Sequence, residues 1–243
     1  MKIKREVVLV VFLVILLAIT IWVTSLGKIG IYSTFTWEQI FYCSWSHLEM
    51  VVVAVFIGTF IGVPLGVLVT RPGLTRLALP VIGGANIGQT IPSLAVIAIM
   101  APILGFGFQS AIVALFIYGL LPIVRNSYTS IKNIDPAIIE AAKGMGMSRG
   151  QIARRIELPL ARPVIMTGIR VSTVITVGTA ELAVLVGGAG LGKITLTGVF
   201  ARETLLILQG AAPTAAMAII LGFILEKAED WMTPRGLKIE KQV

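Results

Sequence analysis

Residues 187–193 follow the spacing Gly-x-x-x-x-Gly-Lys, which is most of a P-loop, the loop that cradles nucleotide phosphates. Three features of the sequence argue against that chemistry. The Ser or Thr that should follow the lysine is Ile194, the preceding segment is an apolar span rather than a strand, and the loop falls on the outer side of the predicted topology. The glycines instead indicate a tight turn.

Side chains that could carry out catalysis are scarce elsewhere. Cys43 is the only cysteine, so neither an internal disulfide nor a multi-cysteine metal site can form. His47 is the only histidine, which leaves little scope for imidazole catalysis or metal binding. We find no Ser/His/Asp or Cys/His constellation, and we therefore expect no catalytic residue, no metal and no cofactor.

The elements that carry these residues are long and apolar. Of 243 residues, 56% are hydrophobic and 13% charged, against about 25% charged in a typical soluble domain. The mean hydropathy is +0.95. This composition predicts an all-α, polytopic membrane protein with about six transmembrane helices. The expected spans cover residues 7–26, 48–70, 77–104, 109–124, 163–187 and 204–225.

Three regions follow from these spans. We expect an N-terminal anchor helix with an outer segment at residues 1–47, a transmembrane domain at 48–226 and a cytoplasmic tail at 227–243. A cleaved signal peptide also fits the basic start, but the first apolar run is long enough to span and no small-x-small cleavage site precedes Lys28. Four aromatic residues in the outer segment indicate an interfacial belt: Trp37, Phe41, Tyr42 and Trp45.

Basic residues set the orientation of the spans. With the N-terminus inside, only three of the 20 Lys and Arg residues fall outside, namely Lys28, Lys193 and Arg202. Arg125, just beyond the fourth span, is counted inside. This bias places both termini in the cytoplasm. It also explains the net charge of +8 through topology, so no nucleic-acid partner is expected.

A polar, basic insertion at residues 135–159 separates the fourth and fifth spans. Asp135 can cap a helix that starts at Pro136, where a missing N–H costs nothing. Gly144 and Gly146 should then break this helix.

A second short helix should follow within the insertion. Ser148 and Gln151 form a capping box for it, and we expect it to stop before Pro159. A solvated helical loop would also fit these signals. The spacing of the insertion favours a rigid helix–turn–helix that docks on a cytoplasmic partner.

Seven residues of the insertion have a characteristic spacing: Glu140, Ala141, Ala142, Gly146, Ile156, Leu158 and Pro159. This pattern resembles the ATPase-coupling loop of ABC importer permeases. Other stretches resemble the type I, methionine-importer-like branch that takes up osmoprotectants such as glycine betaine, choline, carnitine and proline betaine. They are residues 89–95, 118–122, 144–148 and 178–180 with the glycine loop that follows. The resemblance spans about residues 48–222.

The resemblance implies a permease subunit of the bacterial cytoplasmic membrane that is not itself an enzyme. Its implied partners are a cytoplasmic ABC ATPase dimer, a second permease that is identical or related, and an extracytoplasmic substrate-binding protein. An aromatic cage for a quaternary ammonium would then belong mainly to the binding protein. Lipid surrounds the spans.

Two places could line the translocation pathway. Gln89, Thr90, Pro92 and Ser93 interrupt the third span, where polar groups need water or neighbouring side chains. A structural kink explains them equally well. Glu181 lies near the outer end of the fifth span, where the similar permeases have an uncharged residue. A carboxylate there suits a cationic substrate, and a structural hydrogen bond is the alternative.

Two other functions compete with this one. A secondary transporter or channel would be ATP-independent, but repeated halves and several buried charges are not seen. The same importer machinery could instead carry an amino acid, a sulfonate or another small solute. ATP dependence tests the first alternative, and competition between substrates tests the second.

Overall fold

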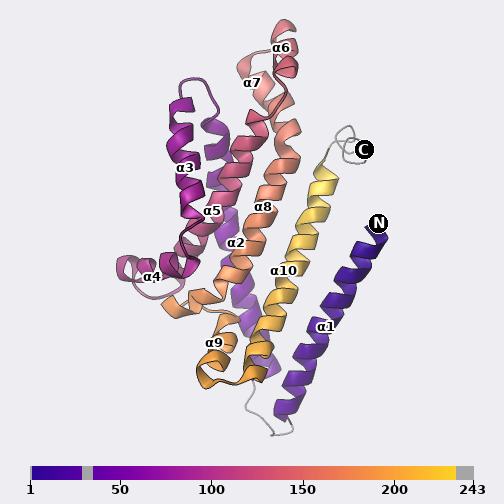
Figure 1. The fold of residues 1–243 in the computed structure, drawn as a ribbon, viewed down its shortest axis with the longest axis vertical. Coiled ribbons are helices and arrows are strands. Elements are labelled where there is room, and N and C mark those ends of the chain that lie inside the picture. Colours follow the sequence, from indigo (N-terminus) through magenta and orange to yellow (C-terminus); the bar gives the residue numbers. More distant parts are fainter. Residues whose placement is uncertain (1, 29–34, 234–243) are drawn as a thin grey trace.

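The structure is a computed structural model that describes residues 2–28 and 35–233. Every regular element within these residues is helical, and five long helices form an elongated bundle (Figure 1). The long helices are α1 (Lys2–Lys28), α2 (Trp37–Leu68), α5 (Phe108–Lys132), α8 (Leu158–Ala180) and α10 (Thr204–Met232). The shorter elements are η1 (Thr75–Leu77), α3 (Ala78–Gly88), α4 (Ser93–Leu104), α6 (Pro136–Gly144), α7 (Arg149–Ile152), η2 (Ala153–Glu157), η3 (Leu182–Val186) and α9 (Gly192–Ala201).

All five long helices are apolar and long enough to cross a membrane. The predicted third span is not straight, because α3 and α4 meet at an angle of 104° around the Gln89–Pro92 break. The two short helices thus form either a broken sixth span or a re-entrant loop. The expected all-α membrane fold with about six spans is confirmed.

Three glycines that recur every four residues lie where α2 packs on α5, and the close contact depends on two of them, Gly62 and Gly66. A Cβ atom added at Gly66 would lie 2.6 Å from Ser127 Cβ and from the carbonyl oxygen of Val124. At Gly62 it would lie 2.9 Å from Leu120 Cδ1, whereas at Gly58 the nearest atom is 3.5 Å away. Small residues therefore let the two backbones approach each other.

The opposite face of α5 packs on α8 in a similar way. Ser172 Oγ donates a hydrogen bond to the carbonyl oxygen of Gly119 at 2.6 Å. A Cβ added at Gly168 would lie 2.7 Å from Asn126 Cβ. Because α5 is held from both sides, it forms the centre of the bundle (Figure 1).

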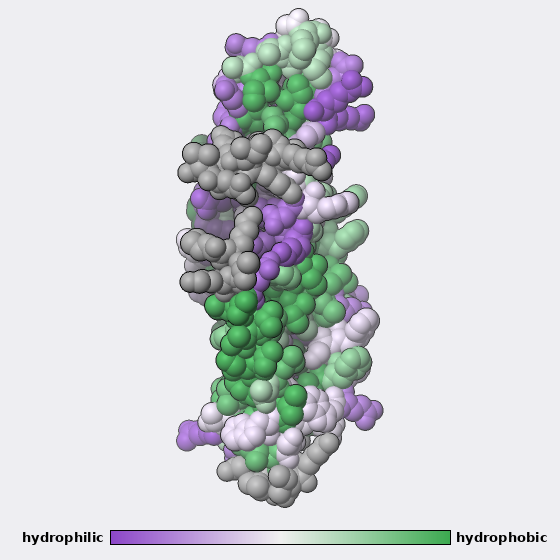
Figure 2. Space-filling view, turned by 90° about the vertical axis from the view of Figure 1, so that its right-hand side faces the viewer, coloured by the Kyte–Doolittle hydropathy of each residue, from purple (hydrophilic) through white to green (hydrophobic). Residues whose placement is uncertain are grey.

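The helix α1 lies at the edge of the bundle against α10. Gln209 Nε2 donates to Thr24 Oγ1 at 3.1 Å, and both side chains are buried. Figure 2 shows a broad hydrophobic band across the lower half of the face formed by these helices, with hydrophilic residues above it. Such a band is what lipid contact requires.

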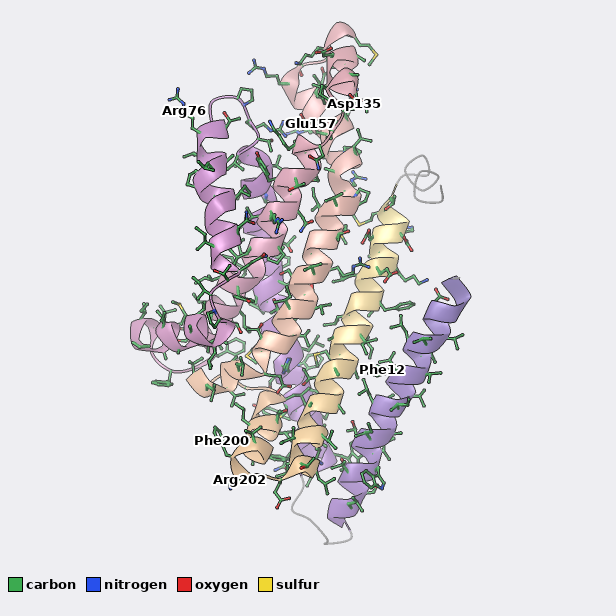
Figure 3. The ribbon with its side chains drawn as sticks, in the orientation of Figure 1. Phe12, Arg76, Asp135, Glu157, Phe200 and Arg202 are labelled. Atoms are coloured by element: carbon green, nitrogen blue, oxygen red, sulfur yellow. The ribbon has the colours of Figure 1, made fainter. Side chains whose placement is uncertain are left out.

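The two ends of the bundle carry different residues. Arg76, Asp135 and Glu157 lie at the end that holds α6 and α7, and Phe200 and Arg202 lie at the other end (Figure 3). The end of α10 lies in the same half as α6 and α7, and α1 runs from about the middle of the bundle to the opposite end (Figure 1).

Several helix ends differ from those predicted. α2 begins at Trp37, so the predicted boundary after residue 47 falls inside a helix. α5 continues to Lys132 and thus includes Arg125. Hydropathy marks the membrane-embedded part of a helix, whereas backbone hydrogen bonds carry the helix further. The predicted tail is helical up to Met232, and residues 234–243 lie outside the described residues.

Candidate functional site

The α6–α7 insertion has the start and the turn that its sequence predicts. Asp135 Oδ1 accepts a hydrogen bond from the N–H of Ala137 at 2.9 Å, which confirms the cap. After α6, Gly146 adopts a φ of +74°, a left-handed conformation that favours glycine. A Cβ added there would meet no atom within 4 Å, so the constraint comes from the backbone and not from space inside this chain.

The second helix of the insertion is capped as predicted but does not stop. Ser148 Oγ accepts from the N–H of Gln151, and Gln151 Oε1 accepts from the N–H of Ser148. α7 then continues through a π-helical turn, η2, directly into α8, so the expected stop before Pro159 is wrong. A wider turn relieves the clash that a proline ring makes with the carbonyl four residues before it.

The seven residues of the coupling pattern differ in exposure. Glu140 and Ala141 are exposed on α6, and Ala142 is fully buried beneath them. Ile156, Leu158 and Pro159 are half-buried where the insertion joins α8. The exposed part is thus presented at the end of the bundle, and its base is continuous with a long helix.

An ion pair ties this base to another helix. The Arg71 guanidinium, in the turn after α2, donates to the Glu157 carboxylate of η2. The two side chains are only 28% and 13% exposed. The insertion therefore has two rigid connections to the bundle: one through the backbone of α8, and one through Arg71.

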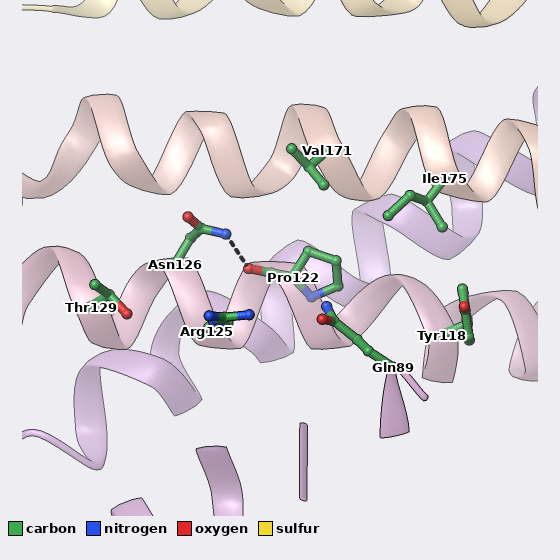
Figure 4. A pocket seen from close by; sticks show the side chains of 8 residues that line it. All are labelled: Gln89, Tyr118, Pro122, Arg125, Asn126, Thr129, Val171 and Ile175. Atoms are coloured by element: carbon green, nitrogen blue, oxygen red, sulfur yellow. Dashed lines mark hydrogen bonds between the residues drawn. The ribbon is translucent and has the colours of Figure 1, made fainter. Parts of the chain in front are cut away.

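A second candidate site is a cavity of about 580 Å³ beside α5 (Figure 4). One wall comes from α5, one from α8 and one from the break between α3 and α4. The lining residues are Gln89, Tyr118, Pro122, Arg125, Asn126, Thr129, Val171 and Ile175.

Of the predicted pathway residues, Gln89 lines this cavity, and the others are not among its lining residues. Thr90 Oγ1 donates to the carbonyl oxygen of Ile87 at 2.7 Å. Pro92 is the N-cap residue of α4, and Ser93 is its first helical residue. The break thus brings Gln89 beside α5, while the other three residues shape the turn.

Glu181 stands at the junction of α8 and η3, because α8 ends at Ala180. Thr214 of α10 donates to Glu181 Oε1, which supports the structural alternative. Oε2 is buried and has no hydrogen-bond partner among the described residues. Burying a carboxylate oxygen without a partner costs free energy. Oε2 therefore favours a hydrogen bond from water or the approach of a cation.

The polar residues of α5 that line the cavity were not among the predicted pathway residues. They are Tyr118, Arg125, Asn126 and Thr129, which recur at helical spacing on one face of α5 together with Pro122. This spacing is a readable signal, because polar residues at i, i+7, i+8 and i+11 in an otherwise apolar helix share one side.

The P-loop-like glycines form turns, as predicted. Gly187 has a φ of +85° and Gly190 a φ of +143°. The N–H of Gly107 donates to the carbonyl oxygen of Val186 at 2.7 Å, so this loop packs on the start of α5. Gly190 also lies against His47, whose ring nitrogens contact Val177 O and Leu191 N.

Comparison with known proteins identifies the class of this fold. Residues 58–236 match the family described as the binding-protein-dependent transport system inner membrane component. The fold also resembles a subunit of the MetNI methionine ABC transporter in inward-facing conformations, with a TM-score of 0.74 and 27% identity over 81% of this chain and 97% of that one. The chain belongs to this transport family and is a multi-pass membrane protein.

Curated relatives are similar over most of the chain. The choline transport system permease protein OpuBB of Bacillus subtilis is 42% identical over 205 residues, covering 84% of this chain and 94% of the relative. The glycine betaine/carnitine/choline transport system permease protein OpuCB of the same organism is 43% identical over 205 residues, with the same coverage of both chains.

Proposed function

We propose that this chain is the transmembrane permease subunit of an ATP-driven importer of quaternary-amine osmoprotectants such as glycine betaine, carnitine and choline. The observation that carries this proposal is the α6–α7 insertion. It presents Glu140 and Ala141 at the end of the bundle and continues into α8, which lines the cavity. The relatives that transport such compounds support the substrate class.

As a member of its family, the chain is not an enzyme, and ATP is hydrolysed by a separate subunit. We propose a complex with a cytoplasmic ABC ATPase dimer, a second identical or related permease, and an extracytoplasmic substrate-binding protein. In our proposal the α6–α7 end of the bundle and both termini face the cytoplasm. The distribution of Lys and Arg supports this orientation.

The coupling step follows from the connections of the insertion. We propose that Glu140, Ala141, Ala142 and Gly146 dock on the ATPase, and that the base at Ile156, Leu158 and Pro159 transmits its movement. A movement of α6–α7 reaches α8 through the continuous backbone, and it reaches the α2–α3 turn through Arg71 and Glu157. Both α8 and the helices joined by the α2–α3 turn pack on α5, so the movement reaches the walls of the cavity.

We propose that the residues of the α3–α4 break and Glu181 belong to the translocation pathway. Gln89 contacts the cavity directly, and Thr90, Pro92 and Ser93 hold the break that places it there. Glu181 would act nearer the other end of the bundle, through the carboxylate oxygen that lacks a partner.

Reconstituted transport tests this function. The tagged chain is purified with its native partners, the complex is placed in proteoliposomes, and uptake of labelled glycine betaine and choline is measured with ATP or a non-hydrolysable analogue on the ATPase side. We expect uptake only with ATP. ATP-independent uptake would contradict the importer. ATP-dependent uptake that methionine inhibits, but betaine and choline do not, would favour the amino-acid alternative suggested by the MetNI likeness.

A further inference from the structure

The cavity beside α5 has an uneven distribution of charge. Among the residues that line it, Arg125 is the only charged one, and no acidic residue is present. The ion pairs among the described residues join Arg71 with Glu157, Arg170 with Glu226 and Glu229, and Lys227 with Glu6. None of them includes Arg125.

Arg125 lies on α5 well before the end of the helix. It precedes the end of α5 at Lys132 by seven residues, which is roughly 10 Å along a helix axis. It therefore stands one residue past the predicted apolar span, on a part of α5 that is still helical and that lines the cavity. At the end of an apolar span, an ionisable side chain that faces a cavity can mark a pathway for polar substrates.

The groups around Arg125 suit an anionic oxygen. A guanidinium binds a carboxylate with two parallel hydrogen bonds. The amide of Gln89 lies between Arg125 and Tyr118 in Figure 4. Asn126 Nδ2 donates to the carbonyl oxygen of Pro122 at 2.8 Å, so the Asn126 side chain is held in place.

The other end of the cavity suits a methylated ammonium. Tyr118 provides an aromatic ring, which attracts a cation through its face. Val171 and Ile175 form an apolar wall on α8 that can contact methyl groups. Tyr118 and Arg125 are two helical turns apart on one side of α5, so the two kinds of binding group are separated along the cavity.

We infer that this cavity is a substrate-binding site of the translocation pathway that selects zwitterions. In this site Arg125 binds the carboxylate of a betaine-like substrate. The inference rests on the proposed function and deepens it by naming the substrate class. Quaternary amines with a carboxylate, such as glycine betaine and carnitine, gain a charge-assisted contact. Choline has no carboxylate and meets only the like charge of the guanidinium.

The test is the ratio of betaine uptake to choline uptake in the reconstituted complex. Arg125→Gln should lower this ratio about tenfold, since a hydrogen bond to a charged group is lost for one substrate only. Arg125→Lys should give an intermediate ratio, because the charge stays but the bidentate fork is lost. Arg76→Gln is the matched control, because Arg76 is exposed at the end of the bundle that holds α6 and α7 and does not line the cavity.

Failure of this inference and failure of the proposed importer function give different results. An unchanged ratio in Arg125→Gln, at equal amounts of assembled complex, overturns zwitterion selection by this cavity. The proposed importer function would still stand. If Arg125→Gln does not assemble, the ratio in Arg125→Lys decides in the same way. A wild-type complex that carries neither betaine nor choline overturns the proposed substrate class and this inference with it.

Discussion

The Arg71 guanidinium is hydrogen-bonded to the Glu157 carboxylate, although 86 residues separate them in the chain. This pair joins the turn after α2 to the π-helical turn that carries the insertion into α8. The α6–α7 insertion is therefore fixed at its base by a contact between side chains as well as by its backbone.

Breaking this pair should uncouple hydrolysis from transport. Glu157→Gln keeps the shape and removes the charge, and we expect it to lower the substrate imported per ATP hydrolysed several-fold. The exchange Arg71→Glu with Glu157→Arg should recover part of the loss, since truncating one partner of a partly buried pair leaves the other without compensation. A wild-type ratio of import to hydrolysis in both Glu157→Gln and Arg71→Gln would show that the backbone alone transmits the movement.

The backbone of the insertion can be tested with two matched glycines. Neither Gly146 nor Gly150 has an atom within 4 Å of an added Cβ, but only Gly146 has a left-handed φ. Gly146→Ala should cost roughly 1–2 kcal/mol in local conformation and reduce coupled transport. Gly150→Ala should be neutral or slightly stabilising, because it lies within α7. Equal uptake by the two variants, at equal assembly, would contradict a requirement for this turn.

The packing of α2 on α5 predicts a gradient of tolerance along one helix. Gly66→Ala places a methyl group 2.6 Å from Ser127 Cβ and should destabilise the protein by roughly 1–3 kcal/mol. Gly58→Ala makes an ordinary contact of 3.5 Å and should be tolerated. Thermal unfolding in detergent measures both. If the two variants unfold at the same temperature, the helices are not held as closely as described.

Thiol labelling tests whether the α3–α4 break faces water. In a Cys43→Ala background, Gln89→Cys should react with a water-soluble thiol reagent in one transport state and be protected in another, because Gln89 lines the cavity. Thr90→Cys and Ser93→Cys should follow if they share the pathway. Phe56→Cys on the exposed apolar surface of α2 should stay unreactive. If all three cysteines of the break are inert in every state, these residues serve packing only.

Glu181 should affect substrates in the opposite sense to Arg125. At an effective dielectric constant near 20, a carboxylate attracts a cation at ~4 Å by about 4 kcal/mol before desolvation. Glu181→Gln should therefore lower choline uptake more than betaine uptake. Thr214→Val removes the hydrogen-bond donor but keeps the charge, and it should change both uptakes alike. If Glu181→Gln also changes both alike, Glu181 has a structural role.

The sequence alone determined the features that depend on neighbouring residues. Apolar runs predicted the spans, and Asp135, Ser148 and Gln151 predicted the caps, because both signals act within a few residues of the backbone. The repeat of Gly58, Gly62 and Gly66 at four-residue spacing is also readable from the sequence as a signal of a close helix contact. The spacing of the coupling residues indicated the transport family.

Only the tertiary structure decided which distant groups meet. The 104° bend brings Gln89 beside α5, where Arg125 shares one cavity with it. Arg71 is hydrogen-bonded to Glu157, and Thr214 to Glu181, although each pair comes from separate elements. A helical period assigns a residue to a face of its own helix, but the neighbour of that face follows from how all helices pack together. The polar side chains of α5 therefore come to line one cavity with Gln89 only in the folded bundle.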